Sequence, residues 1–163
     1  MKVEKIVVHC SDSRYGNAAL IDEWHRDRGF ERRYAFAKDS DLKHIGYHYV
    51  IENGIPAALT DFDPEHDGLV TIGRDEEETG AHAYGLNNRS IGVCLIGKHK
   101  FTDAQFRSLH GVCQTLLTKY ELGPVDIIGH RDTPHEISQE ASRRKTCPNF
   151  DVGKWKAGIE WIF

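Results

Sequence analysis

The stretch 91-IGVCLIG-97 decides the fold, because it is an almost unbroken run of apolar residues. A strand with one solvated face alternates apolar and polar residues, whereas a strand covered on both faces is apolar throughout. The run therefore predicts a strand inside a sheet that has other elements packed on both sides. Four more segments are predicted as strands: 3–9, 46–51, 69–74 and 125–129.

The segment after this strand predicts the clearest helix of the chain. Residues 103–123 repeat apolar side chains at helical spacing, and Thr102 with Gln105 matches a capping box. Cys113 falls on the apolar face of this helix, and Cys94 falls inside the buried strand. Both thiols are therefore predicted to be core residues.

Two further helices complete the expected architecture. One covers 17–29 with Asn17 as its cap, and the other covers 151–163 with Asp151 as its cap. Because strands alternate with helices, the sequence predicts an α/β protein with a single mixed central β-sheet packed by helices. The chain has no internal repeat or linker, so residues 1–163 are expected to form one domain.

Charge and composition exclude some classes of function. The 163 residues carry a formal net charge of −4, so no nucleic-acid partner is expected. No apolar run approaches the roughly 18 residues of a membrane helix, so no membrane insertion is expected. Residues 1-MKVEKIVVHCSD-12 lack the long apolar stretch and the cleavage site of a signal peptide. We therefore expect synthesis in the cytoplasm, where a chain of this size does not normally rely on disulfides.

Three residues at strand ends or in loops are candidate metal ligands: His9, His130 and Cys147. They lie far apart in sequence, so they do not form a local zinc finger. Catalytic zinc sites instead take three protein ligands from separate elements and keep one position for water. Two imidazoles and a thiolate suit zinc well.

Other interpretations of these residues stay open on the sequence alone. Cys147 can be a small buried residue, or a nucleophile activated by His130 with its pKa lowered by Lys145 and its arginine neighbours. His130 can pair with Asp132, and His9 can be a hydrogen-bonded histidine at a strand end. A ligand and a nucleophile both need a thiolate in a positive environment, so the sequence does not separate them.

Six motifs occur in order from His9 to Trp155, over nearly the whole chain: 8-VHCS-11, 46-GYHYVI-51, 73-GRDEEETGAHAYG-85, 87-NNRSIGVCLIG-97, 129-GHRD-132 and 145-KTCPNFD-151. As a set they resemble the type 2 N-acetylmuramoyl-L-alanine amidases, zinc enzymes that include phage lysozymes and peptidoglycan recognition proteins. The residues of these motifs are most similar to those of the phage endolysin branch. The second histidine of the family is matched better by His130 than by His135. The resemblance implies an amidase/peptidoglycan-recognition-protein-like fold.

The resemblance also assigns roles to residues. It implies one zinc ion (Zn2+), with His9, His130 and Cys147 in the positions of the family's three ligands. Tyr47 matches the tyrosine that these enzymes place beside the water on the metal. Lys145 matches the lysine that faces the scissile carbonyl, where a cation stabilises the developing oxyanion.

Two more residues are implied to belong to the substrate groove. His82 matches a histidine of the groove, and Asn87 lies in a motif that shapes it. Three polar segments are longer than a compact phage amidase needs, and they are expected to be surface loops near the groove. These segments are 34–44, 57–68 and 133–144.

The implied reaction is hydrolysis of the amide bond between the lactyl group of N-acetylmuramic acid and L-Ala of the stem peptide. The substrate would be peptidoglycan or a muropeptide, and the protein a phage or prophage endolysin acting on the cell wall. Three alternatives remain: a cytoplasmic wall-recycling amidase, a non-catalytic peptidoglycan-binding module, and a cysteine hydrolase using Cys147 and His130. Some phage amidases also inhibit a host polymerase, a role for which the sequence carries no support.

Overall fold

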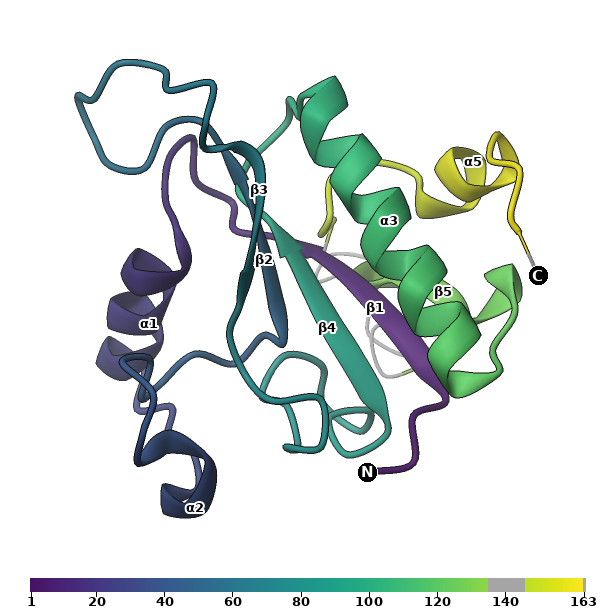
Figure 1. The fold of residues 1–163 in the computed structure, drawn as a ribbon, viewed down its shortest axis with the longest axis horizontal. Coiled ribbons are helices and arrows are strands. Elements are labelled where there is room, and N and C mark those ends of the chain that lie inside the picture. The colour runs from purple at the N-terminus through teal and green to yellow at the C-terminus, as the bar shows by residue number, and fades with distance from the viewer. Residues whose placement is uncertain (135–145, 163) are drawn as a thin grey trace.

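The computed structural model describes residues 1–134 and 146–162, and Figure 1 shows them as one twisted sheet with helices packed against it. Within this part of the chain the sheet has five strands in the order β3-β2-β4-β1-β5. Strands β2, β4, β1 and β5 are parallel to one another, and β3 is antiparallel to β2 at one edge. The bounds are β1 Lys5–Cys10, β2 Tyr49–Asn53, β3 Asp67–Ile72, β4 Ser90–Leu95 and β5 Ile127–Gly129. The predicted mixed sheet is confirmed.

Residues 91–95 of the apolar stretch lie in the central strand β4 (Ser90–Leu95), all six residues of which are buried. Its side chains alternate between two cores. Val93 and Leu95 belong to the core beneath helix α3 (Asp103–Tyr120), while Cys94 belongs to the core beneath helix α1 (Ala18–Asp27). The sheet is therefore covered on both faces, as a continuous apolar strand requires.

Helix α3 forms where it was predicted but ends at Tyr120 instead of residue 123, because Glu121 takes the left-handed backbone conformation (φ 54°). The Thr102 side chain accepts from the main-chain N–H of Gln105, and the Gln105 side chain accepts from the N–H of Thr102, which completes the capping box. Cys113 is fully buried on the sheet-facing side, so its predicted place in the core is confirmed, as is that of Cys94. In Figure 1 the long green helix crosses the sheet obliquely.

Several boundaries differ from the prediction for local reasons. The strand expected at 46–51 begins only at Tyr49, because the N–H of Gly46 bonds the His25 side chain instead of a neighbouring strand. The strand expected at 125–129 is reduced to β5, since Pro124–Asp126 form a 3-10 turn in which Asp126 bonds back to Gly123. The expected long final helix is the short α5 (Val152–Ala157), capped by Asp151 as predicted.

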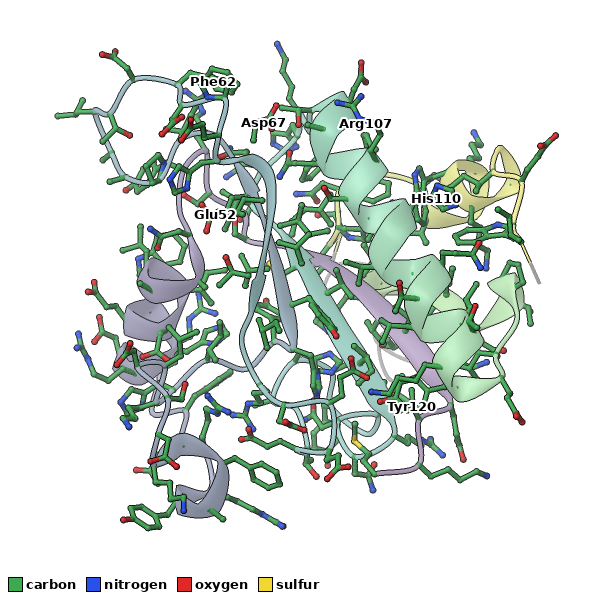
Figure 2. The ribbon with its side chains drawn as sticks, in the orientation of Figure 1. Glu52, Phe62, Asp67, Arg107, His110 and Tyr120 are labelled. Atoms are coloured by element: carbon green, nitrogen blue, oxygen red, sulfur yellow. The ribbon has the colours of Figure 1, made fainter. Side chains whose placement is uncertain are left out.

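The remaining elements are short. Helix α2 (Tyr34–Ala37) lies within the segment expected to be a loop, and the turn η2 (His130–Asp132) follows β5 directly. Figure 2 shows His110 on the side of α3 that faces the C-terminal segment, where its ring packs edge-on against Trp161 with centroids 5.1 Å apart. Among the described residues, no helix combines the length and the apolar character needed to cross a bilayer.

Candidate metal centre

The first two candidate ligands are brought together by the register of the sheet. His9 lies at the end of β1, and His130 directly follows the last residue of β5. In the parallel β1–β5 pair Val8 is opposite Gly129, so the next residues along each strand, His9 and His130, also become neighbours. Their ring centroids are 4.5 Å apart, and the exposed fractions are only 1% for His9 and 8% for His130.

Cys147, which follows residues 135–145 in the sequence, also lies beside His9 and His130. Its main-chain oxygen accepts from the N–H of Arg131 at 2.9 Å, and its Sγ accepts from the N–H of Cys10 at 3.2 Å. Asn149 adds a third tie, because its side-chain amide donates to the carbonyl oxygen of Lys98 at 2.6 Å. These bonds tie the loop to β1 and to the turn that carries the second histidine.

The three candidate ligands form a compact donor set. One ligand atom from each of His9, His130 and Cys147 lies within 4.8 Å of the other two. The Sγ of Cys147 is 3.8 Å from Nδ1 of His9. Two imidazole nitrogens and one thiolate are the kind of donors that zinc takes, and three protein ligands leave a fourth position open. The residues present therefore fit the metal that the sequence implied.

The surroundings of Cys147 affect the ionisation of its thiol. The side-chain interaction with the Cys10 thiol and the loss of solvent raise the pKa of the Cys147 thiol well above its ordinary value, although the main-chain N–H of Cys10 acts in the opposite direction. A thiol in such surroundings ionises only when a cation binds beside it. Lys145, which the nucleophile interpretation needs, lies outside the described residues, as does His135.

Tyr47 lies against the first ligand. Its ring centroid is 5.0 Å from that of His9 and 5.2 Å from that of His25. Burial raises the pKa of the Tyr47 phenol well above its ordinary value, so the hydroxyl stays protonated at neutral pH. Tyr47 can therefore donate a hydrogen bond in the site but is unsuited to act as a base.

His25 is a neighbour that the sequence did not single out. It lies on α1, is almost fully buried, and its Nδ1 accepts from the N–H of Gly46 at 2.8 Å. Burial, together with Arg28 and Arg74, lowers the pKa of His25 to about 4, so the ring is neutral. Its place at helical spacing on the buried face of 17–29 was the available signal.

Asn87 and His82 are also in contact with each other. The side-chain oxygen of Asn87 accepts from the N–H groups of His82 and Ala83, at 2.7 and 2.8 Å. Asn87 thereby fixes the turn that presents His82. The His82 ring itself lies against His9, with its Nδ1 3.0 Å from His9 Nε2, a contact that the sequence did not predict.

His48 is a second histidine that the sequence did not single out. It is fully buried, its Nδ1 accepts from the N–H of Gly92, and its Nε2 donates to the carbonyl oxygen of Glu78, each at 3.0 Å. Since Nδ1 accepts, the proton must be on Nε2 and the ring is neutral. Its edge meets the His82 ring at a centroid distance of 5.6 Å.

A buried ion cluster holds the loop in which Glu78 lies. The Glu78 carboxylate accepts from Arg32 at 2.7 Å and pairs with Arg74 at 3.3 Å. The Arg74 guanidinium also donates to the carbonyl oxygens of Ile45 and Thr79, both at 2.6 Å. These side chains are 5% exposed or less, so the loop that backs His48 is tied on several sides.

A cavity of about 580 Å³ opens at the carboxyl edge of the sheet. Phe62, in the predicted 57–68 loop, lines it and lies against Gly54, where an added Cβ would be 2.4 Å from the ring. The cavity reaches the ligand loop through Lys98, whose carbonyl oxygen accepts from Asn149. Its lining is both cationic and apolar, with Arg14, Lys98 and Lys100 beside Ile55, Phe62 and Phe101.

Known proteins share this fold and this sequence pattern. The endolysin of Escherichia phage T7 is 36% identical over 163 aligned residues, which cover 93% of this chain and 84% of the phage protein. The solved amidase LysC from Clostridium intestinale superposes with a TM-score of 0.69 at 26% identity, covering 96% of this chain and 85% of that one. Drosophila PGRP-LB, at 17% identity and a TM-score of 0.63, covers 98% of this chain and 83% of its own and shares the fold.

A family model also matches the chain. Residues 1–150 match the model described as N-acetylmuramoyl-L-alanine amidase, which includes β1 with His9, the turn with His130, and Cys147. The fold and the family that the sequence motifs implied are therefore confirmed. Because the family model matches residues 1–150 and the T7 endolysin is 36% identical over most of both proteins, the chain belongs to the N-acetylmuramoyl-L-alanine amidase family.

Proposed function

We propose that this chain is a zinc-dependent amidase that serves a phage or prophage as an endolysin. It would hydrolyse the amide bond between the lactyl group of N-acetylmuramic acid and L-Ala of the peptidoglycan stem peptide. The observation that carries the proposal is the convergence of His9, His130 and Cys147 within 4.8 Å in a chain of this family. The phage relatives named endolysin support the proposed place of action, the cell wall.

The metal would be held by two nitrogens and one sulfur. When bound, zinc supplies an acidified water, with a pKa of about 7, and a Lewis acid for the substrate carbonyl. The N–H of Cys10 donates to Cys147 Sγ and thereby stabilises negative charge on that sulfur. The partly buried ring of Tyr47 and the buried ring of His25 would line the site beside His9 and limit access of bulk water.

Two residues are proposed to act on the substrate. Tyr47, which keeps its proton, donates a hydrogen bond to oxygen at the reacting carbon and does not remove a proton. Lys145 is proposed, from the family motif alone, to stabilise the developing oxyanion. His82 and Asn87 retain their proposed place at the groove, with Asn87 acting on the turn that carries His82.

The cavity at the carboxyl edge is proposed to hold the stem peptide. Stem peptides carry carboxylates and aliphatic side chains, and the cavity offers Arg14, Lys98 and Lys100 to the first and Phe62 and other apolar side chains to the second. Its link to the ligand loop through Lys98 and Asn149 supports a peptide that leads away from the scissile bond.

The test is digestion of purified peptidoglycan by the zinc-loaded protein, with products identified by mass. Free stem peptides with a new L-Ala amino terminus, lost on chelation and regained with zinc, are the expected result. Cleavage of soluble muropeptides but not of intact wall would point to a recycling enzyme. Inactivation by thiol alkylation with no dependence on metal would support a cysteine hydrolase, and wall binding without any cleavage would leave a binding module.

A further inference from the structure

A chain of polar atoms leads from the first candidate ligand into the sheet. Nε2 of His9 lies 3.0 Å from Nδ1 of His82, and Nε2 of His82 lies 3.5 Å from both the carbonyl oxygen and the Oγ of Ser90. Ser90 is the first residue of β4 and is fully buried. His82 thus joins the metal centre to the central strand.

The last member of this chain sets the direction of every hydrogen bond in it. Oγ of Ser90 uses its proton on the carbonyl oxygen of Leu86, at 2.7 Å, so both Ser90 oxygens can only accept from His82. The proton of a neutral His82 ring must then be on Nε2, which leaves a lone pair on Nδ1. Nε2 of His9 must in turn carry a proton to donate, so the lone pair of His9 is on Nδ1.

That lone pair is on the side where a metal is needed. Nδ1 of His9 is the nitrogen that lies 3.8 Å from Cys147 Sγ. With the opposite tautomer, a proton on Nδ1 would point at the metal position and exclude a cation. The hydrogen-bond chain through Ser90 and His82 therefore selects the ligand form of His9 before any metal arrives.

The His82 ring occupies a slot built for it. A Cβ added at Gly92 would lie 2.6 Å from Cγ of His82, and one added at Gly80 would lie 2.4 Å from its Cδ2. The edge of His48 closes the slot, with ring centroids 5.6 Å apart. Two glycines without side chains and a fixed neutral histidine leave the ring little freedom to turn away from His9.

We propose that His82 is a positioning residue for His9, which fixes the orientation and the tautomer that bind the metal. The inference rests on the proposed zinc site and gives His82 a role beyond lining the substrate groove. Partners of this kind behind a metal ligand typically change metal affinity by about 10–100-fold when removed.

The experiment compares zinc affinities by competition with a chromophoric chelator. His82→Phe fills the slot but cannot accept, and zinc affinity is expected to fall by about 10–100-fold. His82→Asn places an amide oxygen near the position of Nδ1, so it is expected to recover most of the affinity. His110→Phe, on the side of α3 that packs against Trp161, is the matched control and should bind zinc like the unaltered protein.

A second readout is the tautomer of each ring in the zinc-free protein, from long-range ¹H–¹⁵N correlation spectra. Protons on Nε2 of both His9 and His82 are expected. Unchanged zinc affinity in His82→Phe, or a proton on Nδ1 of His82, would overturn the inference. Failure of the unaltered protein to bind zinc would reject the proposed function instead, while the spectra would still decide the tautomers.

Discussion

The main-chain N–H of Cys10 donates a hydrogen bond to Sγ of Cys147 over 3.2 Å. Cys10 is the residue after His9, so the strand that supplies one candidate ligand also holds another in place. The side chain of residue 147 can therefore be changed with its loop still attached to the turn at Arg131 by a main-chain hydrogen bond. This separation of local fold from metal binding makes a clean first test.

Cys147→Ser should abolish or greatly weaken zinc retention while the protein stays folded, because a hydroxyl is a poor zinc ligand beside two imidazoles. Metal content after dialysis and the circular dichroism spectrum check the two halves of the prediction. Cys113→Ala is the control: its thiol is buried in the α3 core, so only stability should change, by about 1 kcal/mol. Zinc content unchanged in the serine variant would remove Cys147 from the ligand set.

Tyr47→Phe should keep the zinc and lose turnover. The ring packing between His9 and His25 is preserved, and only the hydroxyl donor is removed. Loss of one such donor lowers kcat on the order of 10²-fold. Because the pKa of Tyr47 is raised, the pH–rate profile of the unaltered enzyme should show no limb from its ionisation below pH 10, its ordinary value. A turnover near that of the unaltered enzyme would exclude the donor role.

Glu78→Gln should destabilise the fold strongly. The substitution leaves the buried guanidiniums of Arg32 and Arg74 without their carboxylate, and breaking a buried ion pair costs about 3–5 kcal/mol. Urea unfolding at pH 7 measures the loss. Asp27→Asn serves as the control, since its pair with Arg26 is exposed and worth about 1 kcal/mol or less. Equal effects of the two changes would contradict the account of the cluster.

Stability should fall on the acid side of neutrality, in part because of His25. Its pKa is lowered to about 4 in the folded protein, so the unfolded chain binds more protons as the pH drops below the ordinary value of 6.5. The contribution is fully present above pH 6.5 and is lost as the pH falls towards 4, by up to about 3 kcal/mol. His25→Asn, which can still accept from Gly46, should flatten this part of the profile of unfolding free energy against pH. An unchanged slope would show that other groups dominate.

Two glycine-to-alanine changes should differ in outcome: Gly92→Ala should lower zinc affinity, whereas Gly111→Ala should raise stability. At Gly92 the added Cβ would lie 2.6 Å from the His82 ring, so zinc affinity should fall by about tenfold or more as the ring is displaced from His9. At Gly111, inside α3, the added Cβ meets nothing within 4 Å, and the helix should gain about 0.5–1 kcal/mol. Chelator competition and thermal unfolding, applied to both variants, separate the two outcomes.

The sequence predicted what depends on patterns within single elements. The buried strand β4, the capping box of α3 and the cap of α5 at Asp151 all follow from residue order alone. The three candidate ligands were proposed from their positions at strand ends and in loops. Only the family resemblance favoured them over the other interpretations, because spacing in sequence does not show which strand ends meet. The β1–β5 register brings His9 and His130 together.

The contacts that were missed depend on loops folding over distant residues. His82 touches His9 only because Asn87 shapes its turn, and the ring fits only because positions 80 and 92 carry no side chain. The pairing of Arg32 with Glu78 spans 46 positions and leaves no local pattern. Hydrogen-bond direction and tautomers follow from such geometry, so they were not accessible before the structure. Lys145, outside the described residues, stays a prediction.

The edge strand β5 has only three residues and pairs within the described sheet with β1 alone. One candidate ligand lies in β1, one follows β5, and one lies in the segment that leads to α5. A cation bound by all three would thus stabilise β5 and the residues beside it against local unfolding. In the metal-free protein, β5 should therefore be the first part of the sheet to unfold locally. Hydrogen exchange of the amides of residues 127–130 would then report zinc occupancy, and a protease that cuts beside β5 would distinguish loaded from empty protein.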